Sequence, residues 1–100
     1  MRTVFIVNPK AGKGQGREKF IREIEEASRS TGIPAEVYST QAVGDGEVLA
    51  AQLAEEAEAR EEETRIIACG GDGTLNEVLN GAMHRNYVTI GVVPIGTGND

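Results

Sequence analysis

The segment Gly70-Gly71-Asp72-Gly73-Thr74 holds the residues best suited to chemistry, and it lies between an apolar run and an amphipathic run. Glycine costs about 0.5–1 kcal/mol relative to alanine inside regular structure, so three glycines around one aspartate indicate a backbone that approaches something closely. Amides without neighbouring Cβ atoms can face an anion, and the start of a following helix would add a positive dipole. A carboxylate there suggests metal or proton chemistry. A tight turn, with Asp72 as a helix cap, is the simpler alternative.

The pair Thr74 and Glu77 also fits a capping box, in which a threonine and a glutamate three residues later satisfy amides at the start of a helix. Capping alone is therefore an open alternative for the role of Glu77.

Two further glycine-rich segments are candidates for phosphate binding: residues 8–14 (NPKAGKG) and residues 96–100 (GTGND). The first is not a Walker A motif, because Gly14 stands where a Ser or Thr should follow Gly12-Lys13. It is not a dinucleotide fingerprint either, because Arg17 replaces the third glycine and no acid ends the second predicted strand. Solvated lysines and a chance turn are the alternatives for these two segments.

Elements of alternating type must position these segments. Short β-branched runs predict strands at 3–7, 35–40, 65–69 and 89–95. Helical periods follow the first three, with Asp45 as the expected N-cap of the second helix. The predicted apolar faces are Phe20, Ile21, Ile24, Ala27 and Ser28 in the first helix, Val48, Leu49, Leu53 and Ala57 in the second, and Leu75, Val78, Leu79, Ala82 and Met83 in the third.

This alternation predicts an α/β fold in which a parallel sheet carries helices on both faces. In such sheets ligands bind outside the carboxyl ends of the strands. Every glycine-rich segment directly follows a predicted strand, so all three should meet at one edge of the sheet.

Composition is that of an ordinary soluble protein, with 100 residues, 39% hydrophobic and 26% charged, which allows one small domain. The net charge of −6 argues against nucleic acid as a partner and gives no support for a polybasic membrane anchor. The absence of a signal-peptide pattern and the single cysteine, Cys69, favour the cytoplasm. Cys69 is expected in the core and His84 at an exposed helix end, and no Cys/His spacing indicates zinc.

The segments "NPKAGKG", "GGDGTLNEVLNG" and "PIGTGND", in this order, resemble the diacylglycerol kinase catalytic domain family, which includes sphingosine kinases and bacterial lipid kinases. "GGDGT" alone is shared with NAD kinases and phosphofructokinases, whereas the continuation "LNEVLNG" and the later "GTGND" favour lipid kinases. The resemblance implies a Rossmann-like three-layer fold, with residues 1–100 as the ATP-binding part of a longer protein. A second, β-rich domain would follow.

The resemblance also implies a site for ATP with Mg2+. Asp72 would be the essential carboxylate, and Asp100 would join a polar network tied to magnesium or its waters; no residue is assigned as a direct metal ligand. The residues implied to bind the nucleotide are Asn8, Pro9, Lys10, Ala11, Gly12, Thr40, Gly70, Gly71, Asp72, Gly73, Thr74, Leu75, Asn76, Glu77 and Thr97.

The activity implied by the resemblance is transfer of the ATP γ-phosphate to a lipid hydroxyl such as that of diacylglycerol. The missing domain would hold the lipid and contact the inner face of the membrane peripherally, and a homodimer of the intact protein is left open. The chain stops inside the loop "GTGND", so we expect a fragment that is inactive by itself. An NAD kinase-like enzyme and a non-catalytic nucleotide-binding module are the alternatives.

Overall fold

The computed structural model describes residues 1–8 and 15–94. Strands and helices alternate along the chain, as the sequence predicts, and each predicted strand is found within two residues of its expected bounds. The elements are β1 (Arg2–Val7), α1 (Gln15–Thr31), β2 (Glu36–Ser39), α2 (Asp45–Arg60), β3 (Thr64–Gly70), α3 (Asp72–Ala82) and β4 (Val88–Pro94).

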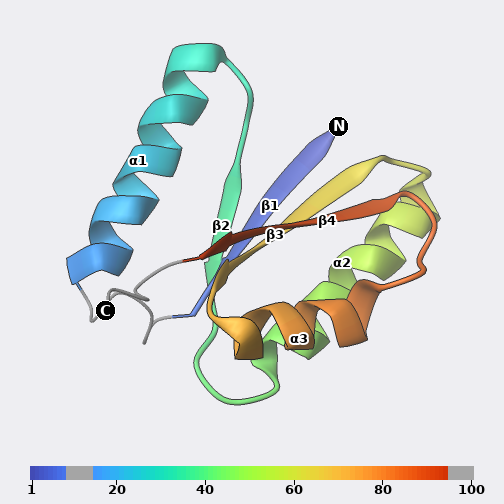
Figure 1. Cartoon of the computed structure of the whole chain (residues 1–100). Helices are drawn as coiled ribbons and strands as arrows, with labels where there is room; N and C mark the ends of the chain where they lie inside the picture. Colours follow the sequence, from blue (N-terminus) through green and yellow to red (C-terminus); the bar gives the residue numbers. More distant parts are fainter. Residues whose placement is uncertain (9–14, 95–100) are drawn as a thin grey trace.

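The four strands form one parallel sheet in the order β2-β1-β3-β4, with α1 on one face and the pair α2 and α3 on the other (Figure 1). This arrangement confirms the predicted three-layer α/β fold. The strand order reverses at β1, because β2 lies on one side of it and β3 on the other. In open α/β sheets ligands bind at such a reversal, outside the carboxyl ends of the strands.

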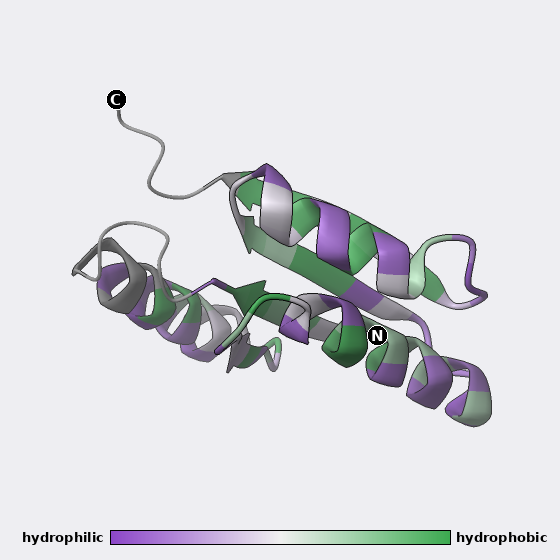
Figure 2. Ribbon diagram, turned by 90° about the horizontal axis from the view of Figure 1, so that it is seen from below, coloured by the Kyte–Doolittle hydropathy of each residue, from purple (hydrophilic) through white to green (hydrophobic). Residues whose placement is uncertain are grey.

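The main core lies between the sheet and the helices α2 and α3. Alternate residues of the central strands point into it, and small residues of α2 meet them there. The strands are mostly apolar, whereas the helices that flank them carry many of the polar residues (Figure 2). The buried members are Val4, Ile6, Ala50, Leu53, Ala54, Ile66, Ala68, Val78 and Ala82.

Two predictions for helix α2 are wrong: the identity of its N-cap residue and the burial of Val48. Its N-cap is Gly44, not Asp45, whose carboxylate instead accepts the backbone amides of Gln41 and Ala42 at 2.8 and 2.9 Å. Val48 is 59% exposed, whereas Leu53 and Ala57 of the predicted stripe are buried as expected, together with the alanines Ala50 and Ala54, which were not predicted. A helix face of small side chains allows closer approach than a face of leucines and valines would.

The capping box predicted for Thr74 and Glu77 is not formed in helix α3. The helix begins at Asp72 with Gly71 as its N-cap, so Thr74 already lies inside the first turn. Glu77 therefore has no N-cap threonine to pair with, and its carboxylate binds elsewhere. Met83 is half-exposed rather than buried because it lies one residue beyond the helix. In α1, Ile24 is buried as predicted, whereas Ala27 is exposed.

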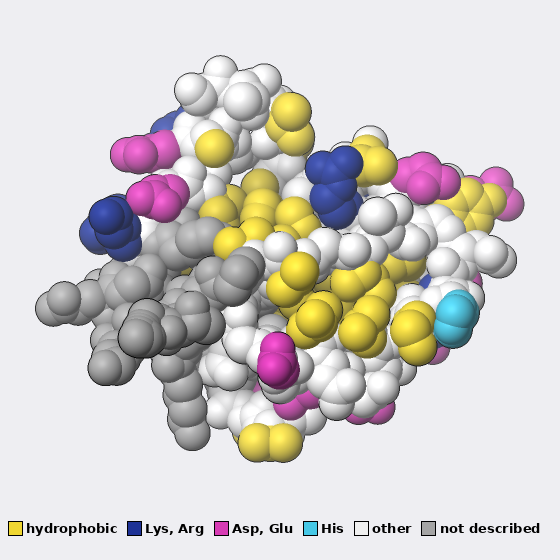
Figure 3. Space-filling view, in the orientation of Figure 1, with side chains coloured by type: hydrophobic (Ala, Val, Ile, Leu, Met, Phe, Trp, Pro, Cys, Tyr) yellow, Lys and Arg dark blue, Asp and Glu magenta, His cyan; other side chains and the backbone are white. Residues whose placement is uncertain are grey.

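Apolar surface remains along the outer side of α3 and the neighbouring part of β4 (Figure 3). Among the described residues β4 pairs only with β3, so its other edge carries no strand. The side chains there include Leu75, Leu79, Met83, Ile90 and Val92, all half-buried or exposed.

Candidate functional site

The carboxyl ends of the four strands lie level with one another. Val7 pairs with both Ser39 and Cys69, and Cys69 also pairs with Val93. Just beyond these pairs, the Thr40 amide donates to the Val7 carbonyl at 2.9 Å and the Asn8 amide donates to the Cys69 carbonyl at 3.1 Å. The four strands therefore end at one edge of the sheet, as the sequence predicts. Residues 9–14 and 95–100, which carry most of two glycine-rich segments, lie outside the described residues.

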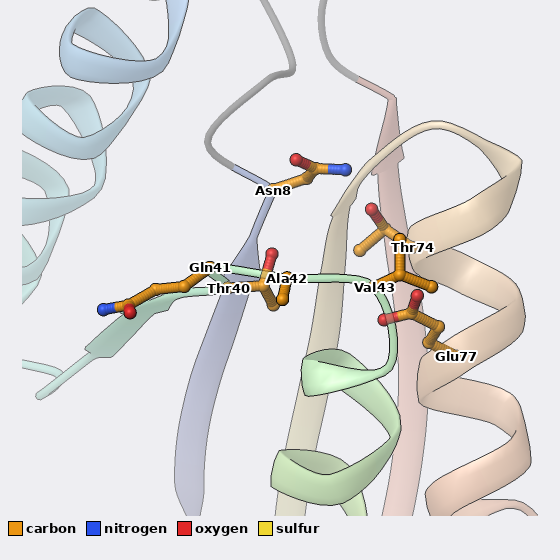
Figure 4. A pocket seen from close by; sticks show the side chains of 7 residues that line it. All are labelled: Asn8, Thr40, Gln41, Ala42, Val43, Thr74 and Glu77. Carbon is orange, nitrogen blue, oxygen red and sulfur yellow. The ribbon is translucent and has the colours of Figure 1, made fainter.

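A hollow of about 90 Å³ lies at this edge, above β1 and between β2 and α3. Four residues implied by the sequence border it: Asn8, Thr40, Thr74 and Glu77 (Figure 4). Thr40 and Thr74 are 9% and 5% exposed, and both belong to the buried polar residues of the described part of the chain.

The connection between β2 and α2 supplies the rest of the wall. Gln41, Ala42 and Val43 line the hollow, although the side chain of Gln41 extends away from the other six (Figure 4). None of these three residues is among those that the sequence predicts for the site. Their position directly after Thr40, at the end of a parallel strand, is the signal that could have identified them.

The three glycines at the junction of β3 and α3 differ in the space around them. Gly70 has φ +156°, and a Cβ atom there would lie 2.7 Å from Thr74 Oγ1, so the fold itself requires glycine. A Cβ atom on Gly71 or Gly73 would meet nothing within 4 Å among the described residues. A tight turn explains Gly70 but gives no steric reason for Gly71 or Gly73.

The first backbone amides of α3 lie beside these glycines and have no acceptor within the helix. Its first internal hydrogen bond runs from the Leu75 amide to the Gly71 carbonyl at 3.2 Å. The amides that precede Leu75 have no acceptor within the helix, and they carry the positive end of its dipole. Such an N-terminus is suited to hold an anion.

The start of α3 divides the implied residues into two groups. Asp72, Gly73, Leu75 and Asn76 border a second, more open depression, and Asp72 and Asn76 are exposed. Thr74 and Glu77 face the hollow. The remaining implied residues, Pro9, Lys10, Ala11, Gly12, Thr97 and Asp100, lie outside the described residues.

Cys69 and His84 lie where the sequence predicts. Cys69 is fully buried, and this burial raises the pKa of its thiol to about 12, so the thiol stays protonated near neutral pH. His84 is exposed just beyond α3, with φ +64°. Neither side chain borders the hollow.

Within residues 1–8 and 15–94, no three His, Cys, Asp or Glu side chains gather as a metal-binding cluster. The same part of the chain contains no helix with the length and apolar character needed to cross a bilayer.

The protein is an α/β protein with a doubly wound parallel sheet, and its hollow lies at the carboxyl edge of the strands, where such sheets bind ligands. Residues 2–100 match the family model described as diacylglycerol kinase catalytic domain, and the chain belongs to that family.

Related proteins agree with this assignment. Diacylglycerol kinases of Staphylococcus aureus strains bovine RF122 / ET3-1 and MRSA252 are each 40% identical to the chain over 103 residues, which cover 99% of the chain. The chain spans about 30% of the length of these curated relatives. A crystal structure of a diacylglycerol kinase from Bacillus anthracis str. Sterne matches with a TM-score of 0.68 and 30% identity, over 99% of this chain and 34% of that chain.

Proposed function

We propose that the protein is an ATP-dependent lipid kinase that transfers the γ-phosphate to a lipid hydroxyl such as that of diacylglycerol. Family membership and the names of the relatives support a lipid rather than NAD as the acceptor. The observation that carries the proposal is the junction of β3 and α3, where Gly71 and Gly73 leave room beside free helix amides. Residues 1–100 would form the ATP-binding part, and a second β-rich domain would complete the enzyme.

In this proposal the amides at the start of α3 hold phosphate oxygens, since phosphoryl transfer depends mainly on positioning and on neutralising charge. Asn8, Thr40 and Thr74 border the hollow that takes another part of the nucleotide. We propose that further residues complete the site from the same edge: Pro9, Lys10, Ala11, Gly12, Leu75, Asn76 and Thr97.

Asp72 is exposed in the first turn of α3, so its charge would repel a phosphate held at the same amides unless a cation lay between them. Mg2+ fits this arrangement, because it is usually held by one or two carboxylates together with phosphates and water. When bound, the ion would neutralise phosphate charge. We propose that Asp72 orients the magnesium-bound water or the acceptor hydroxyl, and that Asp100 belongs to the same polar network.

The acidic chain offers no electrostatic attraction to an anionic leaflet, since its net charge is −6. We therefore propose that the second domain makes the peripheral contact with the inner face of the membrane and binds the lipid, with the protein otherwise cytoplasmic. A homodimer stays a prediction.

The test uses the full-length protein with labelled ATP, Mg2+, and diacylglycerol vesicles and NAD offered side by side. We expect label in the lipid, and we expect Asp72→Asn to lower this transfer at least about 100-fold, as for other groups that act on a transferred proton. Glu63 is an exposed acid directly before β3, at the end of the strand away from Asp72. Glu63→Gln is therefore the matched control and should keep wild-type activity. Label in NAD alone, or in neither acceptor, would overturn the proposal, and near-normal transfer by Asp72→Asn would refute the role of that carboxylate.

A further inference from the structure

The carboxylate of Glu77 crosses from α3 to the start of α2. Its Oε2 atom accepts the Gly44 amide at 3.1 Å, and its Oε1 atom accepts the Gly46 amide at 3.0 Å. These residues are 33 and 31 positions away along the chain. Both oxygens are thus used in charge-assisted hydrogen bonds, which are stronger than bonds between neutral groups.

Glu77 supplies the cap that α2 lacks locally. The N-cap of α2 is Gly44, with φ +94° and no side chain to bind the free amides of the first turn. The Glu77 carboxylate satisfies one of these amides, that of Gly46, together with the amide of the N-cap residue Gly44, and it interacts favourably with the positive end of the α2 dipole.

The lack of a side chain at Gly46 leaves room for the Glu77 carboxylate. A Cβ atom at position 46 would lie 2.7 Å from Glu77 Oε1 and 3.2 Å from Glu77 Cβ. Gly46 is buried in the first turn of α2 and its φ is not positive, so close approach rather than backbone conformation explains the glycine. Glu77 and Gly46 therefore fit each other as a pair.

The segment held by this contact is the connection 40–44, which forms one wall of the hollow. From inside the turn, Asp45 Oδ2 accepts the amides of Gln41 and Ala42. Glu77 connects the end of this turn to α3 by accepting the Gly44 amide, and the N-terminus of the same helix carries the glycine segment. The Glu77 carboxylate lies beside Val43 and below Thr74 (Figure 4).

We propose that Glu77 is a positioning residue for the nucleotide site. Its carboxylate holds the β2–α2 connection against α3, so that the wall containing Thr40 and residues 41–43 is formed before the nucleotide binds. This role rests on the proposed function, because it assumes that the hollow takes part of ATP. It differs from a helix cap within α3 and from a direct contact with phosphate.

The first experiment compares Glu77→Gln with wild type and with Glu47→Gln in the full-length protein. Gln keeps the shape of Glu but has one acceptor oxygen, and its NH2 group would oppose one of the two amides. Glu47 is the matched control, because it is an exposed acid in the first turn of α2. The readouts are amide exchange of segment 41–47 without nucleotide, and kcat and KM for ATP.

We expect Glu77→Gln to speed amide exchange of this segment about tenfold and to raise KM for ATP about tenfold, with kcat changed less than about threefold. Glu47→Gln should change none of these. Unchanged exchange, or faster exchange with an unchanged KM, would overturn the positioning role. If the wild-type protein phosphorylates no lipid but still shows the exchange difference, the kinase proposal fails and the contact itself is confirmed.

A second experiment tests the pair. Gly46→Ala should raise KM for ATP in the wild-type background by displacing the carboxylate. In a Glu77→Ala background the same substitution should add less than about twofold, since the two residues act on one contact. If Gly46→Ala raised KM for ATP by the same factor in both backgrounds, the two residues would act independently and the proposal would be contradicted.

Discussion

Gly81 of α3 faces the backbone carbonyl of Glu47 in α2 so closely that a Cβ atom on Gly81 would overlap this oxygen. The same Cβ atom would lie 3.0 Å from both the Cβ of Ala50 and the amide of Ala51. Gly81 and Gly46 therefore mark two points, one on each helix, where α2 and α3 approach more closely than side chains would allow. This approach brings Glu77 to the end of α2.

Substitution of Gly81 tests that packing. Gly81→Ala should lower the free energy of unfolding by about 1–3 kcal/mol, because the backbone of α2 cannot move aside as a side chain could. The measurement is chemical denaturation followed by circular dichroism. Asn80→Ala is the control, because Asn80 is the exposed neighbour on the same helix and should change stability by less than about 0.5 kcal/mol. Equal stability of Gly81→Ala and wild type would show that the helices do not approach this closely.

Gly73 should behave in the opposite way, because a Cβ atom at that position meets open space. Gly73→Ala is expected to leave stability unchanged or to raise it by up to about 1 kcal/mol, since alanine favours the helix. ATP binding should nevertheless weaken at least about tenfold if phosphate approaches the backbone here. Calorimetric titration with Mg-ATP and thermal unfolding of the same variant separate the two effects. An unchanged affinity for ATP would show that no phosphate group binds beside Gly73.

Arg2 joins three elements at the opposite edge of the sheet. Its guanidinium donates to both carboxylate oxygens of Glu36 at 2.6 and 2.9 Å and to Glu56 at 2.7 Å. The Arg2 side chain is 14% exposed, whereas both glutamates are more than a third exposed and therefore screened by water. We expect Arg2→Met to destabilise the fold by about 1–2 kcal/mol at pH 7.

The pH dependence of this loss has a defined sign. The hydrogen bonds from Arg2 hold the pKa of the Glu36 carboxyl below its ordinary value, although partial burial opposes the shift. A carboxyl with a lowered pKa stabilises the fold above its ordinary pKa, and the stabilisation is lost as the pH falls through the lowered pKa. The stability difference between wild type and Arg2→Met should therefore shrink from pH 7 toward about pH 2. A difference that stays constant over this range would show that Arg2 acts through packing alone.

The sequence predicted the order of the elements and the position of the glycine segments. Both are local properties: hydrophobic periods of two or 3.6 residues define strands and helices, and glycine interrupts them. Because parallel strands share one carboxyl edge, alternation alone was enough to place Asn8, Thr40 and Gly70 near one another. Residues 2–100, which match the diacylglycerol kinase catalytic domain family, include these segments.

Only the tertiary structure decided how α2 and α3 face each other. Periodicity did not identify Val48 as exposed or Ala50 and Ala54 as buried, because the buried face depends on the partner helix. The capping box assigned Glu77 to its own helix, whereas its partners lie 31 and 33 residues away. Such pairings follow from where the chain permits close approach, here at Gly46 and Gly81, and close approach is a property of two packed surfaces rather than of either segment alone.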